Sequence, residues 1–200
     1  MTSSKVQDVL QEVHYLHELF APELLESLEA LRCELPGDSA SQNMVAVRRR
    51  FESEEIAARI TESLPESLAL RVLPSLRFIE YPLGGFIAPH TDGPSFDQRS
   101  QMLSTHTLLL YLTDVCDGGG ATHILSEPSM GGSVLTSIEP RRGSILLFPH
   151  DTPHRGDVVA ADEKVLLRGD LVRTAAADTT KLLSDCNGRE LIDLCQGARS

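Results

Sequence analysis

Apolar residues in the first third of the chain recur at the spacing that is typical of amphipathic helices. Over residues 5–33 they fall every three or four positions, first in a stripe from Val6 to Phe20 and then in a second stripe from Leu24 to Leu31. Pro22 suits the first turn of the second segment, because proline lacks an N–H that this turn does not need. Residues 1–75 are therefore expected to form an N-terminal helical support.

A second helical region is predicted to begin near Ser53 and to end at Pro65. Ser53 is a suitable N-cap residue, and the acidic residues that follow it complement the positive end of a helix. The preceding run from Arg48 to Arg50 has two interpretations. It could face an anionic substrate, but the sequence favours a solvated loop beside an acidic helix.

From Leu76 onward the pattern changes to short, closely spaced apolar segments, which is typical of β-strands. The predicted strands lie in LRFIEY, FIAPH, THTLLLYLT, SVLTSIE, SILLFPH and KVLLRGDLV. Turn signals separate these segments, and in EPRRG Pro140 suits the second turn position and Gly143 the exit.

Repeated short strands without helices between them predict an antiparallel sandwich or barrel. The expected fold class is α+β with a mainly β core, a double-stranded β-helix (jelly roll) buttressed by N-terminal helices. Residues 76–174 would form this core as one structural domain with the helices, and residues 175–200 a C-terminal tail.

The charge of the chain argues against one class of partner. The 200 residues are 41% hydrophobic, and 29 acidic residues against 18 basic ones give a net charge of -11. Such a surface repels phosphate backbones, which argues against a general nucleic-acid binder. Neither the composition nor the pattern indicates an oligomeric state.

Membrane insertion and secretion are not expected. The N-terminus lacks the apolar core of a signal peptide, and the longest apolar run, from Leu108 to Leu112, is too short to span a bilayer. The four cysteines show no zinc-type spacing and are interpreted as reduced thiols. These observations predict a cytoplasmic protein, with a nuclear location as the alternative.

The segment YPLGGFIAPHTD carries the first candidate chemistry. His90 and Asp92 are two residues apart, so on an extended backbone their side chains project to the same face and can bind one metal ion. A third ligand must come from elsewhere, and His150 and His154 both follow a later predicted strand. Two imidazoles and one carboxylate with open positions are typical of a non-haem Fe(II) oxygenase.

A later segment, KVLLRGDLV, predicts an anion-binding pocket. Lys164 and Arg168 share one face of the predicted strand, opposite Val165, Leu167 and Leu171. If helices cover the apolar face, the two cations point into the barrel, where a buried cation requires an anion. The alternative is an edge strand with Lys164, Arg168 and Asp170 in water.

Four segments, in order from about residue 76 to residue 173, resemble the Fe(II)- and 2-oxoglutarate-dependent dioxygenases of the prolyl 4-hydroxylase-like kind. They are YPLGGFIAPHTD, LLLYLTDVCDGGGAT, EPRRGSILLFPH and HRGDVVAADEKVLLRGD. The chain departs from the family pattern at Gly120-Ala121, where Gly-Glu is usual, and in the short segment between Phe148 and His154.

This resemblance implies that His90, Asp92 and His154 are the iron ligands. His154 is preferred to His150 because of its His-x-Gly context and its spacing to Lys164. The ligand histidines must be neutral, so we expect metal binding to weaken as the pH falls below about 6.5.

The resemblance also implies a pocket for the cosubstrate. Lys164 takes the position of the basic residue that grips the far carboxylate of 2-oxoglutarate, and Arg168 is its rival on the same face. Tyr81 and Tyr111 fall at positions whose hydroxyls line this pocket, and Thr107 shares the inward face with Tyr111. For both tyrosines, core packing with a satisfied hydroxyl is an equal alternative.

The implied activity is hydroxylation of a C–H bond with Fe(II), 2-oxoglutarate as cosubstrate and O2, supported by ascorbate. The substrate would be a protein side chain, as for a prolyl hydroxylase, or a small metabolite. The alternative is a non-catalytic jelly-roll sensor or binding module that keeps the metal and 2-oxoglutarate. A nucleic-acid demethylase is a weaker hypothesis because of the net charge.

Overall fold

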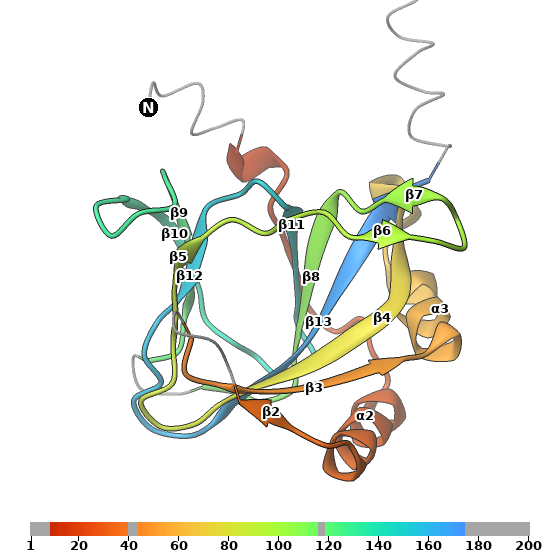
Figure 1. Cartoon of the computed structure of the whole chain (residues 1–200), viewed down its shortest axis with the longest axis horizontal. Helices are drawn as coiled ribbons and strands as arrows, with labels where there is room; N and C mark the ends of the chain where they lie inside the picture. The colour runs from red at the N-terminus through yellow and green to blue at the C-terminus, as the bar shows by residue number, and fades with distance from the viewer. Residues whose placement is uncertain (1–8, 40–43, 116–118, 175–200) are drawn as a thin grey trace, which may run out of the picture.

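The computed structural model describes residues 9–39, 44–115 and 119–174, and the chain in these ranges forms two facing antiparallel sheets with helices on one side (Figure 1). Three sequence predictions concern parts outside the described residues. They are the start of the first apolar stripe, the C-terminal tail at 175–200, and the state of three of the four cysteines.

The helices are α2 (Pro22–Glu34), α3 (Glu54–Ser63) and the short 3-10 helix η1 (Glu66–Leu68). The strands are β1 (His14–Leu16), β2 (Asp38–Ser39), β3 (Val47–Glu52), β4 (Leu70–Tyr81), β5 (Ile87–His90), β6 (Phe96–Asp97), β7 (Met102–Leu103), β8 (His106–Tyr111), β9 (Thr122–Leu125), β10 (Val134–Ile138), β11 (Ile145–Pro149), β12 (His154–Gly156) and β13 (Lys164–Arg173). Within the described ranges, no helix has the length and apolar character needed to cross a lipid bilayer.

The strands form a major sheet and a minor sheet. The major sheet has the order β1-β11-β8-β13-β4-β3-β2, and the minor sheet has the order β10-β9-β12-β5. Strands β6 and β7 form a separate hairpin. Several neighbouring strands come from distant parts of the sequence, such as β8 and β13 in the major sheet and β5 and β12 in the minor sheet, as in a jelly roll. The predicted fold class, a mainly β jelly roll buttressed by N-terminal helices, is confirmed.

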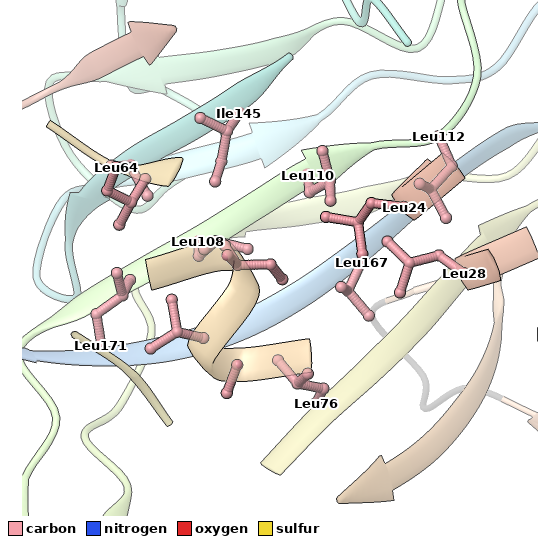
Figure 2. Close-up of a cluster of buried hydrophobic side chains, with 14 of the residues drawn as sticks. Leu24, Leu28, Leu64, Leu76, Leu108, Leu110, Leu112, Ile145, Leu167 and Leu171 are labelled. Carbon is pink, nitrogen blue, oxygen red and sulfur yellow. The ribbon is translucent and has the colours of Figure 1, made fainter. Parts of the chain in front are cut away.

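One hydrophobic core lies between the helices and the outer face of the major sheet (Figure 1). Leu28 of α2 and Ile60 of α3 are completely buried there against leucines of β4, β8 and β13. Figure 2 shows these leucine side chains gathered over the strands. Val165, Leu167 and Leu171 belong to this core, which confirms the predicted apolar face of β13.

A second core lies between the two sheets and surrounds the inner face of β13. Leu166 packs there with Ile79 of β4 and Ile124 of β9. The neighbours of Leu166 on this face, Lys164 and Arg168, are 2% and 7% exposed. Because β13 pairs with strands on both sides, the alternative of a solvated edge strand is wrong.

Two helical or loop predictions in the first 75 residues are wrong. His14–Leu16 forms β1, which pairs with Ile145–Leu147 of β11. The Arg48–Arg50 run lies in β3, which pairs with β4, and not in a loop. In both cases pairing with a strand that is remote in sequence outweighs the local pattern. The first 75 residues therefore contribute strands to the major sheet as well as helices.

Local signals for helix and turn boundaries are confirmed. The Ser53 hydroxyl caps α3 by accepting a hydrogen bond from the N–H of Ile56 at 3.1 Å. Pro22 occupies the first turn of α2. Gly143 leaves the turn before β11 with a φ of 79°, a left-handed conformation that favours glycine.

Leu28→Ala tests the buttressing role of α2. The substitution leaves a cavity between α2 and the major sheet, so we expect the free energy of unfolding to fall by about 2–5 kcal/mol. Urea denaturation would measure this change. Glu26→Ala, at an exposed position of the same helix, is the control and should change stability by less than about 0.5 kcal/mol. Equal effects of the two substitutions would contradict the proposed packing.

Candidate metal centre

Three potential metal ligands converge at one end of the minor sheet. His90 ends β5, Asp92 follows two residues later, and His154 begins β12. His90 and His154 are directly opposite each other in the antiparallel β5–β12 pair, which brings the two imidazoles together. Both Nε2 atoms lie 3.8 Å from an Asp92 carboxylate oxygen. Ligand atoms from all three residues lie within 4.8 Å of one another.

Hydrogen bonds orient both imidazoles toward this centre. Nδ1 of His90 lies 2.8 Å from the carbonyl oxygen of Ala88, and Nδ1 of His154 lies 2.9 Å from that of Thr152. A carbonyl oxygen only accepts, so each Nδ1 carries the proton and each Nε2 keeps a free lone pair. These lone pairs and the Asp92 carboxylate are a donor set that fits Fe(II).

The protonation states of His154 and Asp92 also suit a metal site. Burial and the neighbouring His90 lower the pKa of His154 to about 4, although Asp92 acts in the opposite direction. Burial tends to raise the pKa of Asp92, but Arg168, His154 and the Thr107 hydroxyl lower it to about 2. His154 by itself therefore stays neutral at pH values well below about 6.5, the pH below which the sequence analysis expected metal binding to weaken.

Two residues of the major sheet hold the Asp92 carboxylate. Arg168 forms an ion pair with Asp92 Oδ1 at 3.0 Å and with Asp170 at 2.9 Å. The Thr107 hydroxyl donates to Asp92 Oδ2 at 2.6 Å. Thr107 thus contacts the carboxylate ligand and does not line the cavity described below, where the resemblance had placed it. Arg168 lines that cavity, but its charge is already paired.

His150, the other candidate for third ligand, lies behind Thr107. Its Nδ1 is 2.9 Å from the Thr107 oxygen, and its Nε2 is 2.7 Å from the Ser104 hydroxyl. Since Thr107 donates its one proton to Asp92, it must accept from His150 Nδ1–H, and Ser104 then donates to Nε2. A directed chain of hydrogen bonds therefore runs from Ser104 through His150 and Thr107 to Asp92.

A cavity of about 150 Å³ adjoins the three ligands. Lys164 lines its far part and donates from Nζ to the carbonyl oxygen of Gly120 at 2.6 Å and to the Thr122 hydroxyl at 3.2 Å. Burial lowers the pKa of Lys164 to about 7. No carboxylate of the described residues lies within ion-pair distance of this ammonium group, so an incoming anion would find it unpaired.

The two predicted tyrosines occupy different positions. Tyr81 lines the cavity, and its ring centroid is 5.5 Å from Lys164 Nζ. Tyr111 is completely buried, its hydroxyl donates to Thr122 at 2.9 Å, and it is absent from the cavity lining. Burial raises the pKa of both phenols, which keeps them protonated hydrogen-bond donors.

Sequence reasoning missed several residues at this site. Thr122 and Arg77 line the cavity, as does Arg48, for which the sequence favoured a solvated loop. Arg77 alternates with Phe78 along β4, so its inward orientation follows the period of two once the apolar face is known. No local signal distinguishes Thr122 or the supporting role of His150, because both depend on strand pairing.

The comparisons with known proteins concern the part of the chain that carries this site. Residues 76–169 match the family model described as the 2OG-Fe(II) oxygenase superfamily. The matched segment contains His90, Asp92, His154, Lys164 and Arg168. No curated protein matches the sequence.

Solved structures share the fold at low sequence identity. A viral collagen prolyl hydroxylase of Paramecium Bursaria Chlorella virus-1, in complex with 2OG, is 16% identical with a TM-score of 0.60 and covers 80% of this chain and 95% of its own. A Pseudomonas putida prolyl-4-hydroxylase is 19% identical with a TM-score of 0.58, covering 88% and 100%. HygX of Streptomyces hygroscopicus, with nickel and 2-oxoglutarate bound, is 13% identical with a TM-score of 0.60, covering 88% of both chains.

Thr107→Val tests whether the hydrogen-bond chain supports metal binding. The substitution keeps the shape of the side chain but removes the hydroxyl between Asp92 and His150. Loss of a residue that orients a metal ligand typically lowers affinity about 10–100-fold, and we expect a loss in this range. Anaerobic titration with Fe(II) would measure it. Thr107→Ser keeps the hydroxyl and should bind nearly as wild type; equal affinity of the valine variant would contradict the role.

Proposed function

Because residues 76–169 match the family model of the 2OG-Fe(II) oxygenase superfamily, we propose that this chain binds Fe(II) through His90, Asp92 and His154. The protein is a 2-oxoglutarate-dependent non-haem iron dioxygenase that hydroxylates a C–H bond. The observation that carries the ligand assignment is the convergence of two Nε2 lone pairs and one carboxylate beside a cavity that also contains Lys164.

The residues of the chain prepare the site for this chemistry. When bound, Fe(II) with 2-oxoglutarate and O2 supplies the oxidant that hydroxylates the substrate, while 2-oxoglutarate is converted to succinate and carbon dioxide. Asp92 and the two histidines would hold the metal through one carboxylate oxygen and two Nε2 atoms. Arg168 and Thr107 keep Asp92 ionised and fixed in orientation. Ile79 and Leu166 contribute apolar walls to the cavity.

Lys164 is the proposed partner of the far carboxylate of 2-oxoglutarate. It is buried, unpaired with any carboxylate of the described residues, and part of the same cavity as the ligands. Arg168 is a weaker candidate, because Asp92 and Asp170 already neutralise it. Tyr81 lies beside Lys164 and can contact the cosubstrate, whereas Tyr111 acts through Thr122.

The substrate class is proposed from the relatives and from the site. Two of the similar structures are prolyl hydroxylases, and HygX has been solved with hygromycin B bound. A protein side chain and a small molecule both remain as proposed substrates, and the net charge disfavours a nucleic acid. The complete ligand set and the unpaired Lys164 favour catalysis over the non-catalytic sensor.

The proposed cellular setting rests on cysteine chemistry. Cys33 is exposed and is not in a disulfide. Unpaired thiols persist in the reducing cytosol, so we place the enzyme in the cytoplasm, with the nucleus as the alternative.

O2 as the second cosubstrate and ascorbate as a supporting reductant are also part of the proposal.

Succinate formation from 2-oxoglutarate tests the ligand assignment. Purified protein with Fe(II), ascorbate and O2 should form succinate slowly even without the primary substrate. His90→Ala and His154→Ala each remove a metal ligand, so we expect a loss of about 100-fold or more, beyond the effect of losing an orienting residue. His123→Ala is the matched control, because its ring contacts Ser137 and Asp157 outside the cavity.

Two results of that assay would count against the proposal. If both alanine variants retained wild-type turnover, the ligand assignment would be wrong. If wild type bound Fe(II) and 2-oxoglutarate tightly but turned over no 2-oxoglutarate with any candidate substrate, the non-catalytic sensor would be favoured.

The pH dependence of 2-oxoglutarate binding tests Lys164. Its pKa of about 7 means that the free protein has largely lost this positive charge above pH 7, while a bound carboxylate favours the charged form. Binding above pH 7 must therefore take up a proton, and affinity should fall by up to about tenfold per pH unit. Calorimetric titration of the Mn(II)-loaded protein at pH 6.5, 7.5 and 8.5 would measure this.

Matched variants complete this measurement. Lys164→Arg keeps its charge throughout this range and should flatten the pH dependence, and Lys164→Met should bind 2-oxoglutarate weakly at every pH. Asp92 and His154 do not titrate between pH 6.5 and 8.5, so they do not contribute to the pH dependence of 2-oxoglutarate binding in this range. Identical pH profiles for wild type and Lys164→Met would rule out this role.

A further inference from the structure

The cavity beside the metal centre is strongly cationic in a chain that is strongly acidic. Among the described residues, its lining contains Arg48, Arg77, Lys164 and Arg168 but only one carboxylate, that of Asp92. The chain as a whole carries a net charge of -11. Positive charge is therefore concentrated at this site against the overall balance, which indicates an anionic ligand.

Two of these four cations have no assigned partner. Arg168 is paired with Asp92 and Asp170, and Lys164 is the proposed partner of 2-oxoglutarate. Within the described residues, neither Arg48 nor Arg77 forms an ion pair with a carboxylate.

The two other arginines of the same run are paired. Arg49 contacts Glu80 at 2.7 Å, and Arg50 contacts Asp38 at 3.3 Å. Arg49 projects to the opposite face of β3 from Arg48, whereas Arg50 shares the face of Arg48 but is exposed. Of these three arginines, only Arg48 lines the cavity, and only Arg48 lacks a carboxylate partner among the described residues.

Strand register places the unpaired charge in an unfavourable position for the free protein. Arg77 of β4 is directly opposite Arg50 of β3 on one side and Arg168 of β13 on the other. Like charges directly opposite across strands destabilise a sheet. Burial and the charges of Arg168 and Arg48 lower the pKa of Arg77 to about 10, although the charges of Asp170 and Asp92 act in the opposite direction. The Nε atoms of Arg48 and Arg77 are buried without a hydrogen-bond partner among the described residues.

We propose that Arg48 and Arg77 bind a carboxylate or phosphate group of the primary substrate, so that the hydroxylase is selective for anionic substrates. This inference rests on the proposed function, because it assigns these arginines to the substrate of the same site. An anion placed between the two guanidinium groups would satisfy their free N–H groups and neutralise the repulsion along the row.

The position of Arg77 separates this anion from 2-oxoglutarate. Lys164 is opposite Tyr81, whereas Arg77 is opposite Arg168, which contacts the metal ligand Asp92. The two rows are four residues apart along β13, or about 13 Å. One carboxylate cannot bridge that span. Arg77 therefore lies at the metal end of the cavity, where the reacting bond of the substrate must be held.

The charge balance sets the size of the expected anion. With Fe(II) bound, the metal, Lys164, Arg48, Arg77 and Arg168 would carry two more positive charges than Asp92, Asp170 and the two carboxylates of 2-oxoglutarate carry negative ones. One doubly charged phosphate group matches this remainder, and one carboxylate offsets half of it. A polyanion such as a nucleic acid does not, because the rest of the chain would repel it.

The test uses inorganic sulfate as a probe, since it carries the charge and geometry of the proposed group and binds metals weakly. Calorimetric titration into full-length protein loaded with Mn(II) and 2-oxoglutarate should show saturable binding in the millimolar range. Arg48→Gln and Arg77→Gln should each weaken sulfate binding about tenfold or more, because each removes a charge-assisted contact. Arg59→Gln, an exposed substitution on α3, is the matched control and should leave it unchanged.

The same variants distinguish substrate binding from other roles. Their affinities for Mn(II) and 2-oxoglutarate should remain at the wild-type level, and their melting temperatures without sulfate should be equal or higher, because an opposed positive charge is removed. A weakened affinity for 2-oxoglutarate would instead assign the arginines to the cosubstrate and overturn the proposal. Unchanged sulfate binding in both variants, or none in wild type, would also overturn it.

A turnover assay identifies the source of the anion. Succinate formation by the iron enzyme would be measured with matched acid and amide pairs of free amino acids, and with short peptides that contain glutamate or glutamine. The acid of a pair should stimulate turnover at least tenfold more than its amide, and Arg77→Gln should abolish this preference. Stimulation by amides alone would exclude an anionic substrate. Failure of wild type to bind metal or 2-oxoglutarate would refute the proposed function, and sulfate titrated into the unloaded protein would then test the arginines separately.

Discussion

The buried charge of Asp92 is the interaction on which the rest of the site depends. A carboxylate whose side chain is only 11% exposed is costly unless it is paired and hydrogen-bonded. Arg168 and Thr107 meet both requirements from the major sheet, and they in turn need Asp170 and His150. The charge of Asp92, just after β5 of the minor sheet, therefore orients side chains of β13 and β8 in the major sheet and of the residue that follows β11. The contacts that position Asp92 also join the minor sheet to the major sheet.

Strand register places the apolar core residues on one face of the major sheet and the charged residues of the cavity on the other. Along β13 the residues that face the helices are apolar and completely buried, while the alternate residues carry the cations of the cavity. A shift of one residue would exchange these faces and place Lys164 and Arg168 in the outer core. The leucine-rich packing of α2 and α3 against β4, β8 and β13 therefore also protects the register on which the active site depends (Figure 2).

The inner face of the major sheet divides into two binding regions along the strands. Lys164 and Tyr81 form one end, which suits the far carboxylate of 2-oxoglutarate. Arg168 and Arg77 form the other end, beside Asp92, where we propose that the substrate binds. The separation follows from strand geometry, because side chains on one face repeat every two residues. A single sheet can in this way hold the cosubstrate and select a substrate by charge, without either function depending on a flexible loop.

The sequence by itself determined the features that depend on near neighbours. These include the His90–Asp92 pair, the two faces of β13, the cap of α3 at Ser53 and the glycine turn before β11. The order of its motifs also indicated the 2OG-Fe(II) oxygenase superfamily, whose family model residues 76–169 match, and it favoured His154. Only the tertiary structure decided that residues 14–16 and 47–52 form strands, that Thr107 and Arg168 hold Asp92, and that Arg77 faces Arg168. Those features depend on pairing between strands that are remote in sequence, and local periodicity carries no information about which strands become neighbours.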